Sequence, residues 1–128
     1  MSDKWDIDWQ VVRVNARLIK DYDDKFNYVI DWFKDHPSKN NYGNVKNWIK
    51  MTCMGYKKDP KNWIQIIDEV NILSFQKMSL LSEVNTEDLQ RVLNDLSKRK
   101  YNFQFKGRVP KGHIEFVSAL EDELKVRG

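Results

Sequence analysis

The stretch SKRKYNFQFKGRVPKG, residues 97–112, carries the residue types best suited to bind nucleic acid. Aromatic residues occupy every second position at its centre, at Tyr101, Phe103 and Phe105, and cations flank them on both sides. Exposed rings on a strand can stack on bases while neighbouring cations contact phosphates. The candidate phosphate ligands are Lys98, Arg99, Lys100, Lys106, Arg108 and Lys111.

The alternation of aromatic and polar residues over 101–106 also has a purely structural interpretation. A period of two is typical of a short β-strand or hairpin with one apolar face. We expect that face to pack on helices, so that the rings are buried and residues 98–100 form the basic last turn of a preceding helix. Only an exposed face would provide a base-stacking platform, whereas the tip of the segment, residues 106–111, is expected to be exposed in both cases.

Residues that could catalyse a reaction are few. His36 and His113 have no catalytic partner near them in the sequence, and Cys53, the single cysteine, falls near the apolar stripe of a predicted helix, which favours a buried thiol. The sequence contains no nucleophile elbow and no glycine-rich phosphate loop. We therefore expect no enzyme, no catalytic residue and no cofactor.

The acidic cluster Asp21, Asp23 and Asp24 has a superficial similarity to a calcium-binding loop. It lacks the glycine and the terminal glutamate that such a loop needs at fixed spacings, and the sequence has no zinc-binding motif. We interpret the cluster as helix caps and surface charge, and we predict no metal site.

Trp5 and Trp9 are candidates for contact with a protein partner. Five tryptophans in 128 residues are more than the core of a small helical domain needs, and tryptophan is enriched at interface hot spots. The alternative is that both side chains hold the N-terminal segment against the domain.

Length and composition predict one globular domain over residues 1–128, because 41% of the residues are hydrophobic and 32% are charged. One cysteine excludes an internal disulfide and fits a reducing compartment. The opening MSDKWDIDWQ has no apolar run typical of a signal sequence, and no stretch approaches the ~20 apolar residues of a membrane span. We expect a cytoplasmic protein with no membrane contact.

The net charge of +3 is distributed in blocks of alternating sign. Residues 1–36 hold six cations and eight acidic residues, residues 37–67 six and one, residues 68–97 two and six, and residues 98–128 eight and four. A dedicated nucleic-acid-binding protein usually concentrates its cations on one face. The alternation therefore favours a protein partner, unless the fold brings the basic blocks together.

Apolar spacings of three and four predict helices over most of the chain. Residues 7–35 form one long helix or two short ones, in which case the cluster Asp21, Asp23 and Asp24 caps the second. The helix is expected to end at His36 before Pro37. Residues 37–43 are expected to be a loop, and Asn44 is expected to cap the next helix.

A further helix is predicted to start at Asp59 and Pro60, and residues 72–84 either continue it or form a short strand. Asn85 or Thr86 is expected to cap a helix that ends near Lys100, and a helix from about residue 112 closes the chain. Together these elements predict a mainly α fold, a compact bundle of about five helices.

The opening KWDIDWQVVRVNARLIKDYDDKFNYVIDWF and the mass of 15.4 kDa are similar to those of the small RNA polymerase-binding proteins of T4-like bacteriophages. The similarity lies in size and overall composition, so it identifies no functional residue. It implies a non-enzymatic accessory protein that binds the polymerase core in the host cytoplasm and modulates transcription.

Three functions follow from these observations. In the first, the chain binds a host protein, for which RNA polymerase core is the best candidate, and the alternating charges orient the contact. Alternatively, it binds nucleic acid through residues 98–111, in which case its affinity falls steeply with salt. As a third alternative, it is a phage inhibitor of another host enzyme or defence system.

Overall fold

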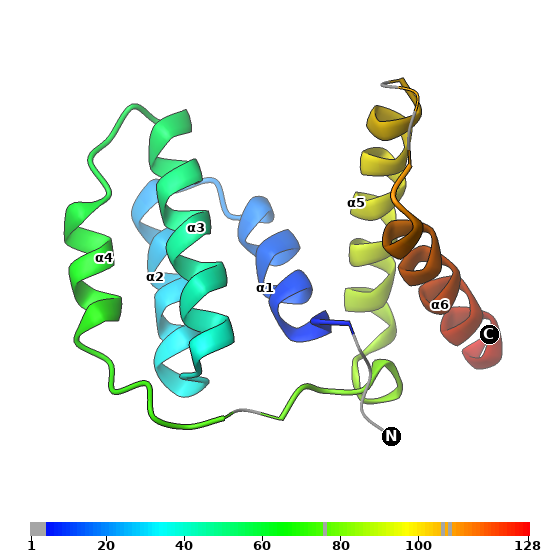
Figure 1. Ribbon diagram of the computed structural model, residues 1–128, viewed down its shortest axis with the longest axis horizontal. Coiled ribbons are helices and arrows are strands. Elements are labelled where there is room, and N and C mark those ends of the chain that lie inside the picture. The colour runs from blue at the N-terminus through cyan, green and yellow to red at the C-terminus, as the bar shows by residue number, and fades with distance from the viewer. Residues whose placement is uncertain (1–4, 76, 106, 108) are drawn as a thin grey trace. The chain divides into compact units, whose positions relative to one another are not determined.

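The computed structural model describes residues 5–75, 77–105, 107 and 109–128, and at 100–105 it describes the backbone. Within these residues the protein has six α-helices and one 3₁₀ turn, so the prediction of a mainly α fold is confirmed (Figure 1). The chain divides into two compact units. The terminal unit consists of Met1–Asn15 with Met78–Gly128, and the central unit is Ala16–Lys77. The expectation of one domain stays a prediction.

Two short helices, rather than one long helix, occupy the N-terminal region. Helix α1 covers Ile7–Leu18 and helix α2 covers Tyr22–Asp35. Asp21 precedes α2 with an extended backbone, and its side chain accepts a hydrogen bond from the Asp24 N–H at 3.0 Å. The prediction that the cluster of Asp21, Asp23 and Asp24 caps a second helix is confirmed, with Asp21 as the N-cap. The predicted end of α2 at His36 is also confirmed.

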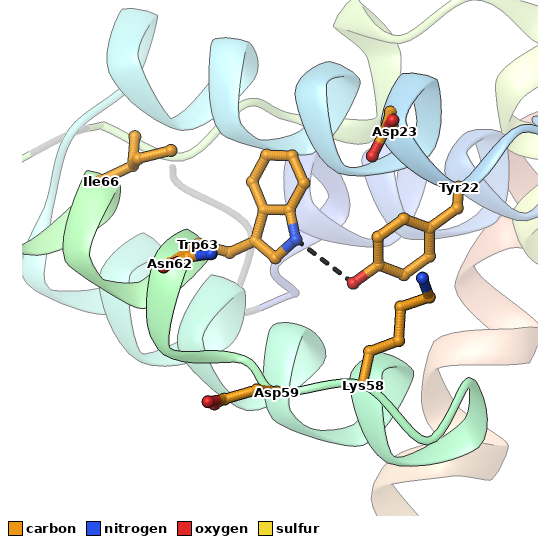
Figure 2. A pocket seen from close by; sticks show the side chains of 7 residues that line it. All are labelled: Tyr22, Asp23, Lys58, Asp59, Asn62, Trp63 and Ile66. Carbon is orange, nitrogen blue, oxygen red and sulfur yellow. Dashed lines mark hydrogen bonds between the residues drawn. The ribbon is translucent and has the colours of Figure 1, made fainter.

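The central unit is built from α2, α3 (Lys39–Gly55) and α4 (Lys61–Asp68), each of which packs against the other two. On one side of this unit Tyr22 of α2 faces Trp63 of α4 (Figure 2). The buried apolar side chains of the three helices are Phe26, Val29, Ile30, Phe33, Val45, Ile49, Cys53 and Ile67.

Helix α3 begins earlier than predicted, because residues 39–43 are helical rather than a loop. Ser38, not Asn44, is the N-cap, and its hydroxyl accepts a hydrogen bond from the Asn41 N–H at 3.0 Å. The Asn41 amide in turn donates to the backbone carbonyl of His36 at 2.7 Å. These polar groups are satisfied within the first turn, and Gly43 is accommodated inside the helix.

Helix α4 begins at Lys61, one residue after the predicted position, and Asp59 still accepts a hydrogen bond from the Lys61 N–H at 3.0 Å. After α4, residues 71–75 and 77–80 are neither helix nor strand. Both alternatives predicted for residues 72–84 are therefore wrong. The only regular structure described there is the 3₁₀ turn Leu81–Glu83.

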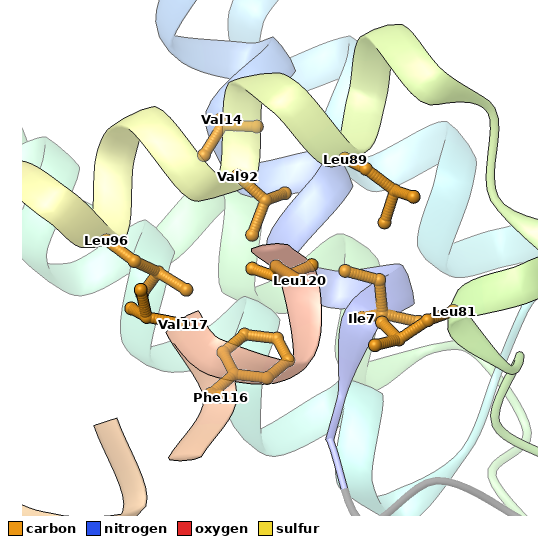
Figure 3. Packing of buried hydrophobic residues seen from close by; sticks show 9 residues of the cluster. All are labelled: Ile7, Val14, Leu81, Leu89, Val92, Leu96, Phe116, Val117 and Leu120. Atoms are coloured by element: carbon orange, nitrogen blue, oxygen red, sulfur yellow. The ribbon is translucent and has the colours of Figure 1, made fainter. Parts of the chain in front are cut away.

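The terminal unit contains α5 (Thr86–Phe105), α6 (Lys111–Arg127), the 3₁₀ turn and most of α1. Asn85 caps α5, since its side chain accepts a hydrogen bond from the Asp88 N–H at 2.8 Å. Helix α6 packs on α5 and on the 3₁₀ turn. Figure 3 shows the apolar core between these elements: Ile7, Val14, Leu81, Leu89, Val92, Leu96, Phe116, Val117 and Leu120.

The predicted strand near residues 101–106 is wrong over residues 101–105, which continue helix α5. The sequence from Thr86 to Phe105 contains neither glycine nor proline, so nothing interrupts the helix once Asn85 has started it. The stop signals come later, at Gly107, which has a φ of 84°, and at Pro110. Three alternating aromatic residues were too few to outweigh this continuity.

Candidate functional site

Three of the six basic residues predicted to bind phosphate have described side chains, and these three lie on two helices. Lys98 and Arg99 are exposed on α5 and Lys111 is exposed at the start of α6. Arg99 forms an ion pair with Asp95 at 3.4 Å, so part of its charge is used within the protein. The side chains of Lys100, Lys106 and Arg108, like the rings of Tyr101, Phe103 and Phe105, lie outside the described residues.

Of the two tryptophans predicted to contact a partner, Trp9 is buried and Trp5 packs on another ring. Trp9 has 7% of its surface exposed. The ring of Trp5 packs on Phe116, with ring centroids 4.8 Å apart. These positions support the interpretation that the two side chains hold the N-terminal segment in place, and their role in binding a partner stays a prediction.

Cys53 and His36, two of the residues considered for catalysis, are packed against other residues of the protein. Cys53 is fully buried, as predicted. His36 stacks on Trp32, and its Nδ1 lies 3.0 Å from the Trp32 carbonyl oxygen.

Among the side chains that the structure describes, no three of His, Cys, Asp and Glu are grouped so that they could hold a metal ion. Within the same residues no helix has the length and apolar character needed to cross a bilayer.

An open pocket of about 550 Å³ lies on the central unit, between the start of α2 and helix α4. Figure 2 shows the indole of Trp63 beside the phenol of Tyr22, with Asp23 above the rings in this view and Asp59 below them. We call this the Tyr22–Trp63 pocket. Its lining residues are Tyr22, Asp23, Lys58, Asp59, Asn62, Trp63 and Ile66.

The two rings at the centre of the pocket are fixed by hydrogen bonds. The Trp63 indole N–H donates to the Tyr22 hydroxyl oxygen at 3.3 Å, and the same hydroxyl lies 3.6 Å from the Cys53 sulfur. Phe26 supports both rings from the core, with centroids 4.7 Å from Tyr22 and 5.0 Å from Trp63. The pocket therefore has a rigid aromatic wall.

Lys58 reaches this wall because of the way α3 ends. The Lys58 N–H donates to the Cys53 carbonyl at 2.8 Å and the Lys57 N–H donates to the Met54 carbonyl at 3.1 Å, which is the hydrogen-bond pattern of a Schellman motif. Lys57 takes the left-handed position with a φ of 55°. The turn directs Lys58 back toward α2, and its Nζ lies 5.0 Å from the centroid of the Tyr22 ring.

The electrostatics of the pocket keep Tyr22 protonated. Burial, followed by the hydrogen bond with the Cys53 thiol, raises the pKa of the Tyr22 phenol, while the hydrogen bond from Trp63 acts in the opposite direction. A neutral phenol presents a ring face to the ammonium of Lys58. The formal charges lining the pocket are then the two carboxylates of Asp23 and Asp59 and the one cation of Lys58.

The pocket was not predicted from the sequence, although two of its lining residues, Asp23 and Asp59, had other predicted roles. Asp23 belongs to the cluster interpreted as helix caps and surface charge, and Asp59 was predicted to start a helix. Helix α4 has eight residues, of which Ile67 is the buried one, so Trp63 and Ile66 remain partly exposed. A short helix with more apolar side chains than it can bury was the available signal.

No protein-family model, no curated protein and no solved structure matches this chain.

Proposed function

We propose that this chain is a non-enzymatic accessory protein that binds a protein partner through its central unit. The observation that supports this is a group of exposed apolar side chains at the end of α3: Met51, Met54 and Tyr56, the last two 69% and 42% exposed. Met51 and Met54 are three residues apart and share one side of the helix. Methionine and tyrosine are enriched at protein interfaces. We call this group the α3 apolar face.

The α3 apolar face adjoins the Tyr22–Trp63 pocket, because the rings of Tyr56 and Tyr22 meet edge to face with centroids 5.0 Å apart. A second exposed group follows α4, where Leu73 is 87% exposed and Phe75 is 100% exposed. Among the described residues, six of the eight exposed large apolar side chains belong to the central unit: Leu18, Met51, Met54, Tyr56, Leu73 and Phe75. Exposed apolar surface of this kind is typical of interaction sites.

The bacterial RNA polymerase core is the first partner to test, because of the resemblance to the polymerase-binding proteins of T4-like phages. Binding there would modulate transcription in the host cytoplasm. Nucleic acid is the less favoured partner, since the helical backbone at 101–105 removes the strand on which the base-stacking platform was based.

The test measures the affinity of the purified chain for purified RNA polymerase core, after nuclease treatment and at two salt concentrations. We expect binding that persists at high salt. Met51→Gln with Met54→Gln, and separately Leu73→Ser with Phe75→Ser, should each weaken it by about tenfold or more. These side chains are exposed, so their replacement should not unfold the protein.

The matched control is Ile114→Gln with Val126→Gln, which replaces two exposed apolar side chains on α6 of the terminal unit. This variant should bind like the wild type. Equal affinities for all the variants would contradict a central-unit interface. Binding that is seen only when the nuclease treatment is omitted, and that falls steeply with salt, would indicate nucleic acid. A chain that does not bind the polymerase core would refute that partner. If the chain then captured another host protein, a loss of capture in the Met51 and Met54 variant but not in the α6 control would show that the capture is specific.

A further inference from the structure

The Tyr22–Trp63 pocket already holds one cation against an aromatic ring. The Lys58 ammonium lies over the face of Tyr22, with its Nζ 5.0 Å from the ring centroid. The negative face of an aromatic ring attracts a cation at this distance. Lys58 is therefore an internal occupant, and its position identifies the kind of group that the pocket accepts.

Trp63 offers a second aromatic face beside Lys58. Phe26 stacks on the indole, with an interplanar angle of 24° and centroids 5.0 Å apart, so that face is covered by the core. A ligand in the pocket would contact the other face of the indole, and the indole is the aromatic ring that binds cations best. The volume of about 550 Å³ has room for one long side chain.

The charged groups of the pocket favour a cationic ligand. Asp23 and Asp59 contribute two carboxylates and Lys58 contributes one ammonium, while the Asn62 amide adds a neutral acceptor. Asp59 accepts a hydrogen bond from the Lys61 N–H with Oδ1, which leaves Oδ2 for a ligand. A planar guanidinium matches this arrangement better than an ammonium, because it can stack on an indole and donate two parallel hydrogen bonds to a carboxylate.

We propose that the Tyr22–Trp63 pocket receives an arginine side chain of the protein partner. The guanidinium stacks on Trp63 and pairs with Asp23 or Asp59, and it displaces the Lys58 ammonium from the Tyr22 ring. This inference rests on the proposed function, since the arginine belongs to the partner that contacts the neighbouring α3 apolar face. Lys58 then acts as a built-in competitor that lowers the affinity for weaker cations.

The test uses a small probe, so it does not depend on knowing the partner. N-acetyl-L-arginine amide is titrated into the ¹⁵N-labelled full chain, and the indole N–H signals of the five tryptophans are followed by NMR. Trp63→Phe assigns the Trp63 signal. We expect this signal to shift saturably, with an affinity in the millimolar range that suits a single side chain. N-acetyl-L-citrulline amide, which has the same shape without the charge, should leave it unshifted.

Two substitutions should change the affinity for the arginine probe in opposite directions. Asp23→Asn with Asp59→Asn removes both carboxylates and should weaken binding by about tenfold. The asparagine at position 59 can still accept the hydrogen bond from the Lys61 N–H. Lys58→Met removes the competing ammonium and should tighten binding by about threefold. A purely structural role for these side chains would not produce opposite effects. Unchanged backbone amide signals away from the pocket confirm that the variants are folded.

The inference is overturned if the citrulline probe shifts the Trp63 signal as much as the arginine probe does, or if neither probe shifts it. It is also overturned if Lys58→Met weakens binding. These outcomes leave the proposed function untouched, because the polymerase measurement with the Met51 and Met54 variant is independent of the probe. Conversely, a saturable arginine shift in a chain that does not bind the polymerase core would refute that partner but keep the pocket.

Discussion

Arg13 of α1 donates a hydrogen bond from Nη2 to Oδ2 of Asp95 on α5, over 2.5 Å and across 82 positions of the sequence. Both side chains are largely buried in the terminal unit, with 10% and 6% of their surfaces exposed. Gln10 accepts a second hydrogen bond from the Arg13 guanidinium at 2.6 Å. On the outer side, Arg99 approaches the same carboxylate at 3.4 Å. The pair connects α1 to α5 by a polar contact beside the apolar core.

Removing one member of this buried pair should destabilise the terminal unit strongly. Asp95→Ala leaves the Arg13 guanidinium buried without its carboxylate, and we expect the free energy of unfolding to fall by about 3–5 kcal/mol. The measurement is urea denaturation followed by circular dichroism. Arg99→Ala removes the half-exposed partner of the same carboxylate and should lower the free energy of unfolding by at most about 1 kcal/mol. Equal losses for the two variants would contradict the prediction that the buried pair of Arg13 and Asp95 stabilises the terminal unit more than the pair of Arg99 and Asp95 does.

Lys57 should be replaceable by glycine with a gain in stability. Its φ of 55° is a left-handed conformation, which disfavours a residue with a Cβ atom by about 1–2 kcal/mol. Glycine is the preferred residue at this position of a Schellman motif, so Lys57→Gly should raise the free energy of unfolding by about 1 kcal/mol. Lys58→Gly is the control, since Lys58 is not in that conformation and its replacement should bring no gain. A loss of stability in Lys57→Gly would show that the α3 terminus is built differently.

Ser38 should contribute to stability as the N-cap of α3. Its side chain is buried and accepts a hydrogen bond from the Asn41 N–H at 3.0 Å. Ser38→Ala leaves that donor without its hydrogen-bond acceptor and should lower the free energy of unfolding by about 1 kcal/mol. Ser118, exposed on α6, provides the control, and Ser118→Ala should change stability by less than about 0.5 kcal/mol. If both serines proved equally dispensable, the helix would begin nearer the predicted position at Asn44.

Tyr42 should ionise at a higher pH than an ordinary tyrosine. The hydrogen bond that its hydroxyl donates to the Asp68 carboxylate, followed by burial, raises the pKa of the phenol, because ionisation would place a second anion beside the carboxylate. Asp68→Asn should therefore lower the pKa of Tyr42 toward its usual value of about 10. The measurement is an ultraviolet absorbance titration of tyrosinate, with Tyr42→Phe identifying the signal.

The same shift has a defined consequence for stability. A phenol whose pKa is raised in the folded state contributes its full stabilisation below about pH 10, and this contribution is lost as the pH rises through the raised value. The alkaline loss of stability should be smaller in Asp68→Asn than in the wild type. A Tyr42 titration that does not respond to Asp68→Asn would contradict the hydrogen bond as the main cause.

Residues 101–105 should give the backbone signals of a helix. Continuation of α5 to Phe105 predicts downfield Cα chemical shifts from residue 101 to residue 105 and sequential amide contacts through the same range. Upfield Cα shifts at these positions would restore the strand that the aromatic alternation first suggested. The neighbouring helical residues 93–97 serve as the internal reference.

Local signals in the sequence were sufficient for most helix boundaries. Asp21 as a cap, Pro37 after His36 and Asn85 before an acidic first turn each act on the backbone of their own segment, so they could be recognised without the fold. The errors at residues 39–43 and 101–105 have the same origin. Short patterns of loop-forming or alternating residues were preferred over the continuity of a helix that already had a start and a later stop signal.

The sequence by itself therefore determined a mainly α chain of capped helices, because capping and helical periodicity are encoded within a few neighbouring residues. Only the tertiary structure decided where Tyr22 and Trp63 meet, since the two residues are 41 positions apart and their contact depends on how α2 packs on α4. It also decided that Lys58 turns onto the Tyr22 ring, through the left-handed residue that ends α3. Contacts of this kind depend on distant packing surfaces, and no short stretch of residues specifies them.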